Sequence, residues 1–73
     1  MKNYKQCEMQ SPAGRTVIIS WLNEDIAKVG TLVEVVDYNE IFKIVDVYNT
    51  TLTEREVKWA ASQAGNITKA SNI

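Results

Sequence analysis

Residues 52–65 carry the signals for both ends of a helix, and no other stretch constrains the fold as much. Thr53, followed three residues later by Glu56, forms a capping box, in which each side chain can satisfy a free amide of the first helical turn. Gly65 stands where helices commonly end on a residue in the left-handed conformation. The pattern therefore predicts one helix over about residues 53–64.

The predicted helix has a narrow apolar stripe of mostly small side chains, so it can approach a sheet closely. The stripe consists of Val57, Ala60, Ala61 and Ala64. Four segments that precede the helix are rich in β-branched and apolar residues, which is typical of short strands. These predicted strands cover residues 3–10, 15–22, 31–37 and 41–48.

The alternation within each strand predicts which side chains face the core. In the second strand Val17, Ile19 and Trp21 share one face, and we expect this face to point inward. In the third strand we expect Val33 and Val35 to point inward.

The fourth strand does not alternate regularly. Its polar residues Lys43 and Asp46 would fall on opposite faces of a regular strand, so we predict a bulge near Val45. Between the second and third strands, residues 23–30 predict a short capped turn that Gly30 closes.

Ile26 and Val29 lie three residues apart in this turn, so we expect them to plug the end of a barrel. These elements predict a mostly β (α+β) fold, namely a small antiparallel SH3-like barrel or half-barrel of four to five strands with one C-terminal helix. Covering the sheet edges in this way is a usual answer to exposed strand edges. Residues 1–65 would form the single domain, and residues 66–73 an extended or frayed tail, or a fifth strand if they join the sheet.

Composition excludes several kinds of chemistry. The chain has 73 residues, a formal net charge of −1, no histidine and one cysteine, Cys7. These counts exclude an internal disulfide, a structural zinc site and histidine-based nucleophile pairs. We therefore expect a protein that is not an enzyme and that has no catalytic residue, cofactor or metal site. The acidic residues Glu34, Asp37, Glu40 and Asp46 are expected to form a solvated sheet face.

No apolar run approaches the roughly 20 residues of a membrane span, and the N-terminus lacks a signal-peptide core. The sequence therefore predicts a cytoplasmic protein without membrane contact. Six residues are candidates for binding, three on the predicted helix and three in or just after the third strand. They are Trp59, Arg55, Gln63, Leu32, Val36 and Tyr38. Trp59 lies off the apolar stripe, where a tryptophan can anchor an interface or pack against the tail.

Two short motifs resemble a known group of proteins. Residues 21–30 read Trp-x-x-Glu-x-x-Ala-Lys-Val-Gly, and residues 69–73 read Lys-Ala-Ser-Asn-Ile. This combination resembles small uncharacterised proteins of tailed bacteriophages, which have the same stretch and a Lys-Ala-Ser-Asp-Ile ending. Asn72 replaces the acidic residue of that ending. The resemblance implies a viral origin and the cytoplasm of an infected bacterium.

The leading hypothesis is a non-enzymatic, self-associating binding protein that modulates a host or defence factor by protein–protein contact. A surplus of apolar residues on both strand faces motivates it. One alternative is a nucleic-acid accessory protein that uses the barrel face, although the charge of −1 does not favour this. Another alternative is an oligomeric sponge for a small nucleotide-like ligand.

Overall fold

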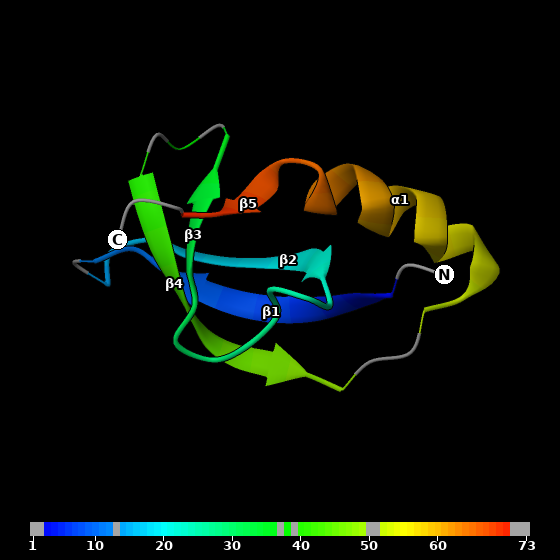
Figure 1. Ribbon diagram of the computed structural model, residues 1–73, viewed down its shortest axis with the longest axis horizontal. Helices are drawn as coiled ribbons and strands as arrows, with labels where there is room; N and C mark the ends of the chain where they lie inside the picture. The colour runs from blue at the N-terminus through cyan, green and yellow to red at the C-terminus, as the bar shows by residue number, and fades with distance from the viewer. Residues whose placement is uncertain (1–2, 13, 37, 39, 50–51, 71–73) are drawn as a thin grey trace.

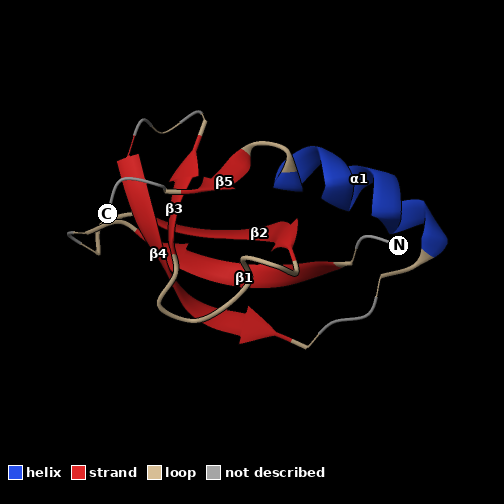
Figure 2. Ribbon diagram, in the orientation of Figure 1, coloured by secondary structure: helices blue, strands red, loops and turns tan. Residues whose placement is uncertain are grey.

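The computed structural model describes residues 3–12, 14–36, 38, 40–49 and 52–70. Five antiparallel strands form an SH3-like half-barrel, and one helix lies at its end, as the sequence predicted. The elements in chain order are β1 (Tyr4–Gln10), β2 (Val17–Asn23), β3 (Leu32–Val35), β4 (Glu40–Tyr48), α1 (Glu54–Ala64) and β5 (Ile67–Lys69). Figures 1 and 2 show the strands next to one another, with α1 at one end of the sheet.

The strand order in the sheet is β2-β1-β4-β3-β5, so β2 and β5 are its two edges. Helix α1 packs mainly on β2 and also contacts β5, the strand that follows it in the chain. The helix therefore lies mainly against the edge strand β2 and leads directly into β5, at one end of the half-barrel (Figure 1). Of the tail predicted for residues 66–73, residues 67–69 form β5 and pair with β3, whereas residues 71–73 lie outside the described part.

The bulge predicted near Val45 is confirmed. Glu8 of β1 pairs with Asp46 of β4, but the next residue, Met9, pairs with Ile44, so Val45 is the extra residue. The bulge shifts the inward face by one position and leaves Lys43 and Asp46 both exposed.

The core lies on the concave face of the sheet. Cys7 and Met9 of β1 have no exposed surface, and the predicted inward positions Val33 and Val35 of β3 are also buried. The core cluster comprises Cys7, Met9, Leu22, Ala27, Val33, Val35, Phe42, Ile44 and Ile67.

The predicted face of β2 is wrong for two of its three residues. Val17 is 52% exposed and Ile19 is 53% exposed, whereas Trp21 is buried. The register explains this, because Ile18 lies opposite the buried Met9 and therefore packs against the core instead. Trp21 is buried although it alternates with the exposed residues, because α1 packs against β2 and its Gln63 bonds to Ser20 and Trp21.

The predicted capping box forms at the start of α1. Glu56 Oε1 accepts hydrogen bonds from the Thr53 backbone N–H at 3.2 Å and from its hydroxyl at 2.8 Å. Ala60 and Ala64 of the predicted stripe are buried, and Val57 at its beginning is 42% exposed.

The predicted left-handed C-cap at Gly65 is wrong. Gly65 has φ −65° and ψ −21°, which is right-handed helical backbone, and its N–H donates to the Ala61 carbonyl. The helical hydrogen bonding thus runs on through the turn, and the Asn66 N–H donates to Gln63 just before β5 begins. The chain therefore leaves the helix without a residue in the left-handed conformation at Gly65.

The turn between β2 and β3 closes at Gly30, as predicted, with φ +94°. The plug residues differ in part from those predicted. Ile26 packs against the core and its neighbour Ala27 is buried, but Val29 is 66% exposed. The Ile26 N–H donates to the Asn23 carbonyl at 3.1 Å and the Ala27 N–H to the Glu24 carbonyl at 3.2 Å, so residues 23–27 form two successive turns, and Ala27 rather than Val29 lies in the core.

Candidate binding surfaces

The exposed face of α1 carries two of the predicted binding residues. Trp59 is 53% exposed, and Arg55, four residues earlier, is also exposed. Residues four apart lie on the same side of a helix, so both side chains project from one surface. This surface points away from the buried Ala60 and Ala64. A tryptophan that is half exposed on a rigid element has the properties of an interface anchor.

The third predicted helix residue, Gln63, has a structural role. Its Oε1 accepts one hydrogen bond from the Ser20 hydroxyl at 2.8 Å and another from the Trp21 backbone N–H at 3.2 Å. Both donors belong to β2, so this amide holds the C-terminal part of α1 against the edge of the sheet. It leaves Trp59, one turn away, on a fixed element.

The other predicted residues lie on β3 and just after it. Val36, the residue just after β3, is 68% exposed, and Leu32, the first residue of β3, is half-buried. Tyr38 is 48% exposed, and its ring lies edge-on to the buried Phe42 ring at a centroid distance of 5.5 Å. These residues do not join the Trp59 surface, because β3 and α1 are separate parts of the half-barrel (Figure 1).

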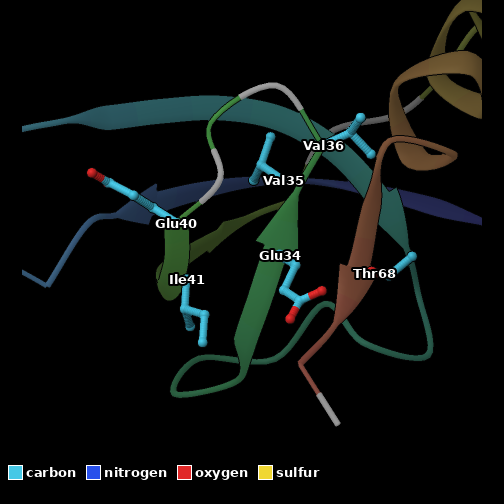
Figure 3. Close-up of a pocket in the computed structure, with 6 residues that line it drawn as sticks. All are labelled: Glu34, Val35, Val36, Glu40, Ile41 and Thr68. Atoms are coloured by element: carbon cyan, nitrogen blue, oxygen red, sulfur yellow. The ribbon is translucent and has the colours of Figure 1, made fainter. Parts of the chain in front are cut away.

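A shallow pocket of about 260 Å³ lies between the β3–β4 hairpin and β5. Its lining comprises Glu34, Val35, Val36, Glu40, Ile41 and Thr68. Glu34 pairs with both Ile41 and Thr68 in the register, so these three residues share the outer face. Figure 3 shows the Glu40 side chain pointing away from Glu34. The two carboxylates do not converge on one point, and their charge disfavours an anionic ligand in the pocket.

The edge of β2 is a surface that the sequence analysis missed. Val17 and Ile19 are exposed side by side on its outer face, whereas they were predicted to be core residues. No signal in the sequence marks this exposure, because the whole strand, Val17–Asn23, contains no charged residue. Natural edge strands usually carry a charge, a proline or a bulge that blocks further pairing.

Buried polar chemistry is limited in the described part of the chain. Burial raises the pKa of the Cys7 thiol to about 11, so the thiol is protonated and unreactive near neutral pH. The Tyr48 hydroxyl donates to Glu8 Oε1 at 3.0 Å, and this hydrogen bond raises the pKa of Tyr48. Neither group resembles an activated nucleophile.

The described residues contain no group of three or more His, Cys, Asp or Glu side chains that could hold a metal ion. Asp37, one of the acidic residues considered above, lies outside this part. No helix among the described residues is long and apolar enough to cross a membrane. No family model, curated protein or solved structure matches the chain at a significant level.

Proposed function

We propose that the protein is a non-enzymatic binding module that acts by contact with another protein, using the exposed face of α1 around Trp59. The observation that carries this proposal is the 53% exposure of Trp59 on a helix whose opposite side is buried. Tryptophan and arginine are the side chains most enriched at interface positions that contribute strongly to binding, and Arg55 lies one turn from Trp59.

The way α1 is held supports the proposal. Its first turn is fixed by the capping box, and its last turn by the hydrogen bonds of Gln63 to β2. A partner would therefore meet a preorganised surface, and less conformational entropy would be lost on binding than with a mobile segment. Because of the resemblance to phage proteins, we expect this partner to be a host or defence factor in an infected bacterium.

The two other functions have less physical support. If an oligomeric sponge for a nucleotide-like ligand used this pocket, the phosphates would lie beside Glu34 and Glu40, where charge repulsion opposes binding. A nucleic-acid accessory protein would need a basic surface, and the chain has 8 Lys and Arg residues against 9 Asp and Glu.

The test is capture of proteins from a lysate of infected bacteria on the immobilised chain, read by mass spectrometry. Three forms are compared: the wild type, Trp59→Ala and the matched control Val57→Ala, which truncates another exposed side chain of α1. Circular dichroism checks that each variant folds, and in Trp59→Ala the fluorescence of the remaining tryptophan, Trp21, is a second check.

We expect one or more proteins to bind the wild type and the control, and the captured amount to fall about tenfold or more with Trp59→Ala. Equal capture by all three forms, or no specific capture by the wild type, would overturn the proposal.

A further inference from the structure

The two edges of the half-barrel differ in how they are protected. Strand β5 is three residues long and has Lys69 as its last residue, and short length and lysine both discourage further pairing. Strand β2 is seven residues long and has no charge, proline or bulge of its own. Of these two edges, β2 is the one open to a further strand.

The hydrogen bonds fix which backbone groups of β2 point away from the sheet. Glu24 N–H donates to the Asn3 carbonyl, and Ser11 N–H donates to the Thr16 carbonyl. In an antiparallel pair such bonds recur at every second residue, so the even-numbered residues of β2 bond to β1. The backbone groups of Val17, Ile19 and Trp21 therefore point outward.

Only one end of this outward row is covered by α1. The Trp21 N–H donates to Gln63 Oε1, so the helix occupies the edge at that position. In the described part of the chain, no second strand or side chain bonds to the outward groups of Val17 and Ile19. Their side chains, 52% and 53% exposed, flank the same short segment.

We propose that this segment pairs with the same segment of a second copy, antiparallel across a two-fold axis through Ile18. In this register the amide and carbonyl of each Val17 bond to Ile19 of the other copy. The paired positions also bring the exposed Val17 side chain of one copy against the exposed Ile19 side chain of the other. β-branched cross-strand pairs of this kind stabilise antiparallel sheets.

The second copy fits this edge for three reasons. The edge is self-complementary, as a two-fold interface requires, because each copy offers the same donors and acceptors in antiparallel order. The strand is uncharged, so two copies do not repel each other there. Gln63 occupies the edge at Trp21 and so excludes registers that use the outward groups of that residue, whereas the register centred on Ile18 uses only those of Val17 and Ile19.

The proposed interface is small. A short strand pairing lies at the low end of specific interfaces, below about 1,200 Å² of buried area. We therefore expect a weak dimer, with a dissociation constant on the order of 10 µM to 1 mM. This surface is distinct from the Trp59 face, so the dimer and the proposed function can fail independently.

The first experiment measures the average mass by sedimentation equilibrium from about 10 µM to about 2 mM, a range set by the expected affinity. We expect the wild type to move from one chain toward two. Ile19→Lys places a charge on the pairing edge and should keep the protein at one chain. Val29→Lys, which puts the same charge at another exposed valine, should behave as the wild type. Trp59→Ala should dimerise normally.

A second measurement tests the pairing itself. Amide hydrogen exchange of Val17 and Ile19 should slow several-fold as the concentration rises, whereas exchange at Trp21, whose amide is bonded to Gln63, should hardly change. A wild type that stays at one chain throughout would overturn the proposal, and the edge would then be open only to a strand from another protein. Dimerisation unaffected by Ile19→Lys, or without slower exchange at Val17 and Ile19, would overturn it equally.

Discussion

Cys7 sits in the middle of β1 with no exposed surface. Burial is the main reason that the pKa of its thiol rises from 9.0 to about 11, and the nearby Asp46 carboxylate adds to the rise. The folded state therefore favours the protonated thiol more than the unfolded state does. This preference stabilises the fold fully below about pH 9 and is lost as the pH rises through about 11.

We predict that the native thiol reacts slowly with a thiol-specific reagent near neutral pH, because it is both buried and protonated, and that urea exposes it.

We also predict that the free energy of unfolding falls between about pH 9 and about pH 11. Denaturant titrations at several pH values measure this fall. In Cys7→Ala the fall should be shallower, since the other titrating groups remain. An identical slope in both proteins would contradict the prediction.

At the scale of the elements, the backbone conformation at the end of α1 predicts how a substitution of Gly65 changes stability. The left-handed cap that the sequence favours would predict the opposite change. Gly65 has φ −65°, so an alanine fits there without backbone strain, and its Cβ would meet the nearest carbonyl oxygens at 3.5 Å, an ordinary contact. Gly65→Ala should stabilise the protein by about 0.4–1 kcal/mol, because alanine has less freedom in the unfolded chain. Urea denaturation measures the change.

Gly30→Ala is the matched comparison. The same addition at φ +94° should destabilise the protein by about 1–2 kcal/mol, although no atom crowds the site. If both substitutions destabilised equally, the backbone conformation at Gly65 would have to be left-handed after all.

The contact between α1 and β2 depends on one amide oxygen. Gln63→Leu removes the acceptor of the Ser20 hydroxyl and the Trp21 N–H, and we expect it to lower the free energy of unfolding by about 1–3 kcal/mol. Exchange of the Trp21 amide should become faster. Gln63→Glu keeps an oxygen acceptor at the same reach and should retain most of the stability. A loss as large with glutamate as with leucine would show that the hydrogen bonds are not the cause.

At the scale of the whole molecule, β5 completes the core. Ile67 is only 3% exposed and lies opposite the buried Val35 of β3. Ile67→Ala should lower the free energy of unfolding by about 2–5 kcal/mol, a large fraction of what a domain of this size has. Thr68→Ala, at the exposed neighbour, should change it by less than about 0.5 kcal/mol. Equal effects in denaturant titrations would mean that the tail does not pack as described.

Local signals in the sequence predicted the parts of the fold that local chemistry decides. The capping box of Thr53 and Glu56 predicted the start of α1, and the conflict between Lys43 and Asp46 predicted the bulge at Val45. The face of β2 could not be derived in this way. Both of its faces carry β-branched residues, and burial depends on the pairing with β1 and on where α1 packs.

The candidate surfaces show the same difference between features that local sequence decides and features that tertiary packing decides. The exposure of Trp59 followed from its position off the apolar stripe, a property of one helix. The outward row of Val17 and Ile19 depends on the strand order, which places β2 at an edge. A three-residue strand such as β5 is too short to show a period, so the sequence alone does not predict its pairing with β3.

The hydrogen bond from Ser20 to Gln63 spans 43 residues, and that from Tyr48 to Glu8 spans 40. Contacts so distant along the chain require large loops to close before any stabilisation is gained. We therefore expect folding on the millisecond-to-second timescale that is usual for small barrels, far slower than helical bundles of similar size.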